Sequence, residues 1–188
     1  MLIGIIIAIA IVIIDQISKA IVMNNMSLNQ VIQVIPNLLK FRYVENTGMA
    51  FSALSDSTPL LVVISLVATF AIGYILYKFV DFKNKKVLSL SLAFMLGGTI
   101  GNLIDRFLTV IGVRNGVIDF IELYIGDTNI IGGSTFNIAD AFLVVGCVLL
   151  VIDLLILDTV RKNKKDDEAV EPVKLEENSD GQEDNSRQ

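Results

Sequence analysis

The stretch LIGIIIAIAIVIIDQISKAIV, residues 2–22, is apolar except for a few polar residues near its end. A helix of about 20 residues rises about 30 Å, which matches the hydrocarbon core of a membrane. No Lys or Arg precedes this stretch, and Asp15 and Lys19 stand where a secretory signal would carry small residues for cleavage. We therefore predict a retained membrane-spanning helix.

Three more apolar blocks of similar length follow, at residues 59–80, 87–108 and 136–160. A soluble chain that is 53% hydrophobic would not gather its apolar residues into four such blocks. Because lipid offers the backbone no hydrogen-bond partners, these blocks are predicted to be helices. Residues 1–165 are thus expected to form one membrane domain with four transmembrane helices.

The basic residues predict how the chain is oriented in the membrane. Loops rich in Lys and Arg stay in the cytoplasm. Here such residues occupy the loop after the second block and the segment after the fourth (Lys78, Lys83, Lys85, Lys86, Arg161, Lys162, Lys164, Lys165). Both termini are therefore predicted to be cytoplasmic, and segments 23–58 and 109–135 to lie outside. In the first of these, aromatic and basic residues alternate in LLKFRYVE, residues 38–45, which predicts a half-buried strand.

The end of the chain accounts for its negative charge. Residues 166–188 hold nine acidic and two basic residues, so a net charge of −5 for the chain leaves +2 for residues 1–165. This segment has no apolar periodicity. It is predicted to be a disordered acidic tail in the cytoplasm.

The residue types exclude several kinds of chemistry. The chain contains no histidine, which excludes Ser-His and Cys-His catalysis and the commonest metal ligand. The single cysteine, Cys147, permits no disulfide within the chain and no zinc cluster. Acid–base catalysis would therefore depend on carboxylates. We expect no metal, no organic cofactor and no nucleic-acid partner.

Two aspartates lie where the chain leaves and re-enters the membrane. Asp119 stands in the apolar sequence GVIDFIEL, where desolvation favours a neutral carboxyl group. Asp140 follows Asn137 by three residues, which is typical of a helix cap and also compatible with a site. If the two carboxyls meet, they share a proton, and one can act as base while the other acts as acid. We predict that Asp119 is the protonated partner and Asp140 the ionised one.

Two further pairs of polar residues lie within the predicted spans. In GGTIGNLIDR, residues 97–106, Gly97 and Gly101 would let another helix approach closely, while Asn102 and Arg106 share a face suited to a substrate carbonyl or a lipid head. Their alternative role is simply to end the span. Asp15 and Lys19 also share a helix face, either as a structural ion pair or as a contact for substrate or headgroup.

Five motifs appear in order along residues 10–150: DQISK (15–19), ENTGMAF (45–51), GGTIGNLIDR (97–106), GVIDFIE (116–122) and FNIADAF (136–142). With these motifs on four predicted spans, the chain resembles the bacterial lipoprotein signal peptidases, also called signal peptidase II. Two departures from the family pattern are a longer stretch between Arg106 and Asp119 and the acidic tail.

The resemblance implies an intramembrane aspartic endopeptidase of the bacterial cytoplasmic membrane, with its active site at the outer face and a small extracytoplasmic β-cradle. Such an enzyme removes the signal peptide from diacylglyceryl-modified prolipoproteins, cutting just before the lipidated cysteine. The resemblance implies a catalytic pair, five residues that line or support the site, and two that brace it (Asp119 and Asp140; Asn46, Gly48, Asn102, Arg106 and Asn137; Asp15 and Lys19). We expect a monomer whose partners are prolipoproteins and membrane lipids.

Two other classes of membrane protein remain as alternatives. A proton-coupled transporter also uses membrane aspartates, but its relay should place titratable groups through the membrane depth. The core of the span at 59–80 has none. An assembly protein would use the G-x-x-x-G for helix packing, but would leave two carboxyls at one edge unexplained.

Overall fold

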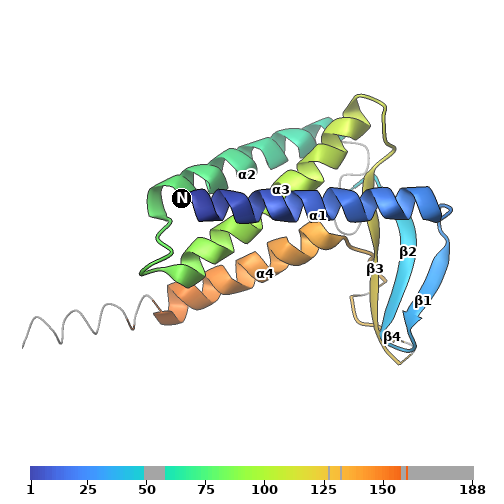
Figure 1. Ribbon diagram of the computed structural model, residues 1–188. Coiled ribbons are helices and arrows are strands. Elements are labelled where there is room, and N and C mark those ends of the chain that lie inside the picture. Colours follow the sequence, from blue (N-terminus) through green and yellow to red (C-terminus); the bar gives the residue numbers. More distant parts are fainter. Residues whose placement is uncertain (49–57, 127, 132, 158–159, 161–188) are drawn as a thin grey trace, which may run out of the picture.

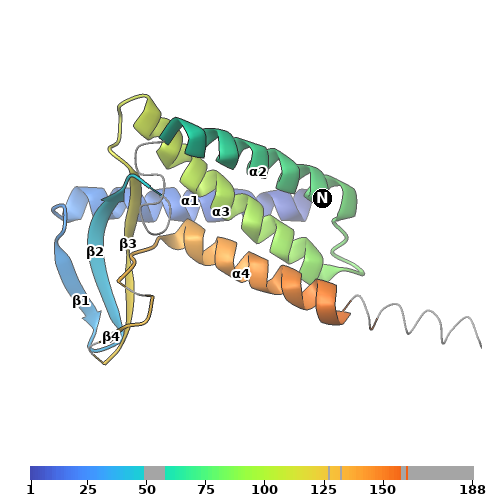
Figure 2. The same cartoon turned by 180° about the vertical axis from the view of Figure 1, so that it is seen from behind.

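The computed structural model describes residues 1–48, 58–126, 128–131, 133–157 and 160. They form four long helices with a small sheet at one end of the helix bundle (Figures 1 and 2). The helices and their bounds are α1 (Leu2–Asn25), α2 (Thr58–Phe79), α3 (Lys86–Val110) and α4 (Ile138–Ile152), the last continued by a π-helical turn, η2 (Asp153–Leu157). The predicted acidic tail lies outside the described residues.

All four helices are long and apolar enough to cross a membrane. They also expose large apolar side chains, such as Ile6 on α1, Phe70 on α2 and Val144 on α4. Exposed apolar surface on this scale is unfavourable in water and favourable in contact with lipid. The prediction of four membrane-spanning helices is confirmed.

The sheet has four antiparallel strands in the order β1 (Val31–Ile35), β2 (Leu39–Asn46), β3 (Val117–Ile125) and β4 (Thr128–Asn129). The strand predicted at residues 38–45 is therefore confirmed as β2. Its alternation has the expected cause, since Phe41 and Tyr43 pack on a core formed by β3 and the end of α1. The β2–β3 pairing also places Asp119 opposite Val44.

Helix α3 is the centre of the bundle and packs against α1, α2 and α4. Its glycines allow this, because a side chain would collide with the neighbouring helices. A Cβ atom on Gly97 would lie 2.8 Å from the Ile11 Cβ, and one on Gly98 would lie 2.4 Å from the Ala139 carbonyl oxygen. The predicted close approach of another helix is therefore present, and α3 makes it with both α1 and α4.

Candidate active site

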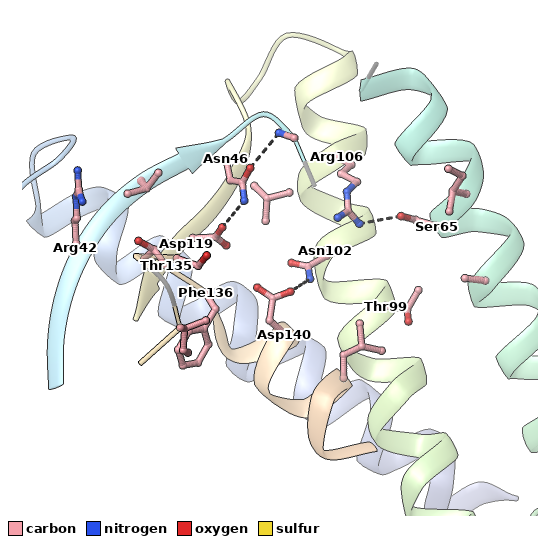
Figure 3. Close-up of a pocket in the computed structure, with 18 of the residues that line it drawn as sticks. Arg42, Asn46, Ser65, Thr99, Asn102, Arg106, Asp119, Thr135, Phe136 and Asp140 are labelled. Atoms are coloured by element: carbon pink, nitrogen blue, oxygen red, sulfur yellow. Dashed lines mark hydrogen bonds between the residues drawn. The ribbon is translucent and has the colours of Figure 1, made fainter. Parts of the chain in front are cut away.

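The two predicted catalytic aspartates line one cavity of about 820 Å³ (Figure 3). Asp119 comes from β3, and Asp140 comes from the first turn of α4. Just before α4 begins, Phe136 forms an antiparallel β-bridge with Ile121 of β3. This bridge brings the start of the helix, and with it Asp140, back to the strand. The sheet and the helix start thus bring together two carboxyls that are 21 positions apart in the sequence.

Asp140 belongs to a helix cap as well as to the cavity. The Asn137 side chain accepts a hydrogen bond from the Asp140 amide at 2.9 Å, and the Asp140 carboxylate accepts one from the Asn137 amide at 3.2 Å. This reciprocal pair is a capping box, which satisfies backbone donors that a helix start would leave free. The two interpretations of Asp140, as cap and as site residue, are compatible because the cap leaves the carboxylate facing the cavity.

All four carboxylate oxygens of the aspartate pair accept a hydrogen bond from an amide. Asn46 Nδ2 and Asn137 Nδ2 donate to the two oxygens of Asp119, at 2.9 and 2.7 Å. Asn102 Nδ2 donates to Asp140 Oδ1 at 2.7 Å, and the Asn137 backbone amide donates to Asp140 Oδ2. Amide donors stabilise a carboxylate, so these contacts hold both groups in place and support a negative charge on the pair.

The environment of Asp119 favours a bound proton. The residue is 2% exposed and stands between Ile118 and Phe120, which are also buried. Burial, followed by repulsion from Asp140, raises the pKa of Asp119 from 3.8 to about 7, although the amides of Asn46 and Asn137 act in the opposite direction. The direction agrees with the prediction that Asp119 is the protonated partner, and the assignment itself stays a prediction.

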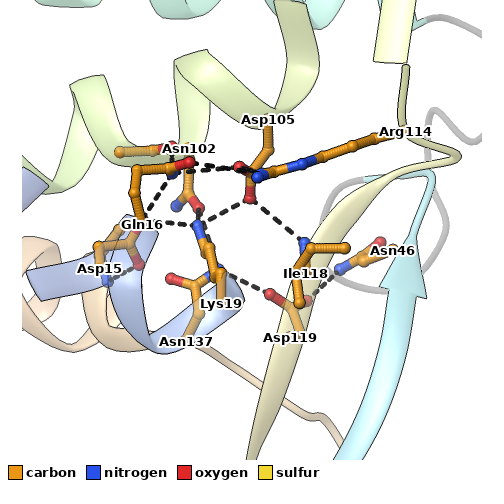
Figure 4. A network of polar contacts seen from close by, with 12 residues as sticks. Asp15, Gln16, Lys19, Asn46, Asn102, Asp105, Arg114, Ile118, Asp119 and Asn137 are labelled. Carbon is orange, nitrogen blue, oxygen red and sulfur yellow. Dashed lines mark hydrogen bonds and ion pairs between the residues drawn. The ribbon is translucent and has the colours of Figure 1, made fainter. Parts of the chain in front are cut away.

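A buried lysine behind the pair orients the amides (Figure 4). Lys19 Nζ donates to Asn102 Oδ1 at 3.2 Å, and Asn137 Nδ2 donates to the same oxygen at 3.0 Å. With its oxygen fixed by these two donors, Asn102 must direct its NH₂ group toward Asp140. Lys19 therefore determines which way the Asn102 amide faces.

The same lysine is part of a cluster of four charges, formed by the buried Asp15, Lys19 and Asp105 and the partly buried Arg114. Lys19 Nζ lies 2.8 Å from a carboxylate oxygen of Asp15 and 2.8 Å from one of Asp105, and all three side chains are fully buried. Arg114 pairs with the other oxygen of Asp105, and Gln16 bridges Asp15 and Asp105. Of the two roles left open for Asp15 and Lys19, the buried geometry matches the structural ion pair.

Two members of this cluster were missed in the sequence. Asp105 accepts a hydrogen bond from the Ile118 amide at 3.3 Å, next to Asp119, so it helps to place β3. Its spacing of three from Asn102 could have indicated a shared helix face. Arg114 gave no signal, because it lies in a loop that returns to α3 only in the folded chain.

Asn46 is held at the end of β2 by the segment just before β3. Gly116 lies so close that a Cβ atom there would be 2.7 Å from the Asn46 carbonyl oxygen. Glu45 accepts hydrogen bonds from Tyr43 Oη at 2.8 Å and from Asn115 Nδ2 at 2.9 Å. These contacts tie the long connection after α3 to β2, and so keep the Asn46 amide on Asp119.

Arg106 and Gly48 also line the cavity, as predicted. Gly48 donates its amide to Asn46 Oδ1 at 3.0 Å, which orients that side chain as Lys19 orients Asn102. Arg106 contacts Ser65 on α2 at 2.9 Å, while its Nε is buried and has no partner among the described residues. Because Arg106 lines the same cavity as the two carboxyls, its guanidinium group is suited to hold a carbonyl oxygen of a bound peptide.

Comparisons with known proteins agree with this arrangement. Residues 7–156 match the family model described as "Signal peptidase (SPase) II". The chain is 37% identical to lipoprotein signal peptidases of Listeria monocytogenes (serotype 4a) and Listeria innocua, over 85% of this chain and 97% of theirs. The lipoprotein signal peptidase of Listeria welshimeri is 36% identical over the same shares.

Two solved structures of bacterial membrane enzymes have the same fold. The first superposes with a TM-score of 0.69 at 28% identity, over 91% of this chain and 94% of that chain. The second has a TM-score of 0.67 at 30% identity, over 81% and 92%. The protein is thus a membrane-embedded enzyme, and these matches give no support to the transporter alternative. The chain belongs to the signal peptidase II family.

Proposed function

We propose that this protein is an aspartic endopeptidase that removes the signal peptide from diacylglyceryl-modified prolipoproteins, cutting just before the lipidated cysteine. The observation that carries this proposal is the aspartate pair, with an amide donor on each of its four oxygens, facing a cavity of about 820 Å³. The relatives in Listeria are lipoprotein signal peptidases, which supports the substrate class.

The proposed reaction uses one proton on the aspartate pair. Asp140, as carboxylate, accepts a proton from a water molecule while the water oxygen bonds to the scissile carbonyl carbon. Asp119, as neutral acid, gives its proton to the carbonyl oxygen. When the tetrahedral intermediate collapses, the C–N bond breaks and Asp140 gives its proton to the leaving nitrogen, which becomes the amino group of the lipidated cysteine. Asp119 takes a proton back from the hydroxyl group that becomes the carbonyl oxygen of the new carboxyl terminus. Arg106 is placed to stabilise the carbonyl oxygen.

We propose that the sheet and the site lie at the outer face of the bacterial cytoplasmic membrane, with both termini inside. The lysine-rich loop between α2 and α3 lies at the end of the bundle away from the sheet, close to the N-terminus (Figure 1). Lys and Arg near span ends favour the cytoplasmic side. Two acyl chains anchor a lipidated substrate in the bilayer, so its scissile bond would reach the enzyme at that interface. We propose that the enzyme acts as a monomer in contact with membrane lipids.

The test is cleavage of a lipidated precursor peptide by purified enzyme in lipid vesicles. Asp119→Asn and Asp140→Asn should each lower the rate by about 10³-fold or more, because an acid and a base that act as a unit are both required. Asp81→Asn is a matched control, because Asp81 lies in the α2–α3 loop and makes its hydrogen bonds there. Near-normal turnover by either dyad variant would refute the catalytic assignment.

A further inference from the structure

The cavity contains two arginines whose Nε atoms are buried without a partner. Among the described residues, only three buried side-chain nitrogens lack a hydrogen-bond partner, and two of them are Arg42 Nε and Arg106 Nε. Both residues line the cavity that contains the aspartate pair. Arg106 lies on the helix side of the pair and Arg42 on the sheet side (Figure 3). Because a buried N–H without an acceptor is costly, both positions are suited to a ligand with acceptor oxygens.

Most N–H donors of Arg42 are free to bind a ligand, because its acidic neighbour Glu122 already accepts hydrogen bonds from other side chains. The Arg42 guanidinium lies 3.5 Å from a carboxylate oxygen of Glu122, which is long for an ion pair, and the Arg42 side chain is 42% exposed. Glu122 is buried and accepts hydrogen bonds from Tyr124 Oη at 3.0 Å and Thr135 Oγ1 at 3.2 Å. Glu122 therefore holds Arg42 at the cavity wall without using most of its five N–H donors.

The position of Arg42 on β2 sets its distance from the scissile bond. Asn46, four residues further along β2, holds Asp119. Four residues of a strand span about 13 Å. An extended substrate running from the aspartate pair beside β2 would therefore pass Arg42 within about two to four residues, allowing for the reach of the arginine side chain.

The direction of the bound chain follows from the two ends of the cavity. On the helix side the lining includes apolar residues of α2 and α4, two of the helices apolar enough to cross a membrane: Ala68, Ile72 and Leu143. These suit the apolar signal peptide. The part of the substrate that follows the cut must then leave toward the sheet, where Arg42 stands.

We propose that Arg42 forms a subsite for a carboxylate side chain within the first four residues after the lipidated cysteine, so that the enzyme prefers substrates that are acidic there. This inference rests on the proposed function and adds a charge preference to it. The contact is a partly exposed pair in which the planar guanidinium of Arg42 matches the geometry of a carboxylate.

The test compares lipidated peptides that carry Asp, Asn or Lys at the second, third or fourth position of the mature part. For the wild-type enzyme, kcat/KM should be about threefold to tenfold higher for Asp than for Asn at the best position, between the values for an exposed ion pair and a charged hydrogen bond. Added salt should reduce the ratio. Arg42→Gln should bring the ratio of kcat/KM for the Asp and Asn peptides to one, and Arg42→Glu should favour the Lys peptide.

The matched control is Lys40→Gln. Lys40 is a cation on the same strand, but its Nζ lies 3.9 Å from the centre of the Tyr124 ring, and it is not part of the cavity lining. This variant should keep the wild-type preference. Equal rates for Asp and Asn peptides in the wild type, or a preference that survives in Arg42→Gln, would overturn the proposal.

Two further measurements distinguish this subsite from a failure of the proposed reaction and from binding of a lipid headgroup. Binding of the same peptides to Asp119→Asn enzyme should show the charge preference without cleavage, so the subsite can be tested even if the proposed reaction is wrong. Vesicles with and without anionic phospholipid show whether Arg42 instead binds a headgroup phosphate. An effect of Arg42→Gln that follows lipid charge and ignores peptide charge would refute the peptide subsite.

Discussion

Asp119→Asn should change the stability of the protein in a direction that depends on pH. The raised pKa of Asp119 means that the folded protein binds a proton more tightly there than the unfolded chain does. The free energy of unfolding must then fall as pH rises from about 4 to about 7, because ionisation of Asp119 favours the unfolded state. Asparagine does not ionise, so the free energy of unfolding of the variant does not fall in this way as pH rises.

The structure allows the size of the effect to be worked out. A shift from 3.8 to about 7 corresponds to about 4 kcal/mol of stability lost by the wild type above pH 7. Against this, asparagine has one acceptor oxygen, whereas Asp119 accepts from both Asn46 and Asn137. One mismatched amide costs about 1–3 kcal/mol at every pH. The variant should therefore be less stable than the wild type at pH 4.5 and more stable at pH 8.

Unfolding by a denaturing detergent, measured by circular dichroism in mixed micelles at each pH, provides the assay. Asp81→Asn is the control, because its stability difference from the wild type should stay constant from pH 4.5 to 8. Hydrogen bonds from Asn84 lower the pKa of Asp81, so its contribution is present above pH 4 and is lost as pH falls below that value. A stability difference between wild type and Asp119→Asn that stays constant from pH 4.5 to 8 would refute the reasoning.

Three further variants test the support of the site. Lys19→Met should lower the free energy of unfolding by about 3–5 kcal/mol in the same detergent assay, because it leaves the buried Asp15 carboxylate without a cation and Asp105 with Arg114 alone. Gly98→Ala should slow peptide cleavage by pushing α4 away from α3, whereas Gly73→Ala, whose Cβ would meet only a side-chain carbon at 4.0 Å, should not. Truncation after Lys165 should leave the cleavage rate unchanged, because the acidic tail is predicted to lie across the membrane from the site.

The helices could be predicted closely because the residues of each helix are themselves enough to specify it. A run of about 20 apolar residues specifies a helix in lipid with little help from the rest of the chain. β2 could be predicted because Phe41 and Tyr43 alternate with charged residues in the strand itself. β3 gave no such alternation, since its first four residues are all buried. A continuous buried run does not distinguish a strand from a short helix.

The members of the site could be named from motifs, but their hydrogen bonds could not. Asp119 and Asp140 were expected to meet because one loop separates them. The amides that hold them are set by contacts between different helices, such as Lys19 on α1 with Asn102 on α3. Arg42 shows the same limit. In the sequence Arg42 is just one of the polar residues of an alternating strand. The folded sheet is what places it on the cavity wall.

The buried cluster of Asp15, Lys19, Asp105 and Arg114 also fixes how far α1 can slide along α3. Apolar helix faces look much alike from one turn to the next, so packing alone specifies their alignment weakly. A slip of one turn would move Lys19 about 5.4 Å along the bundle, beyond contact with Asp105. Buried charges would lose their partners at a cost of several kcal/mol. The cluster therefore sets the register of the two helices, and with it the height at which Lys19 meets the side-chain oxygen of Asn102.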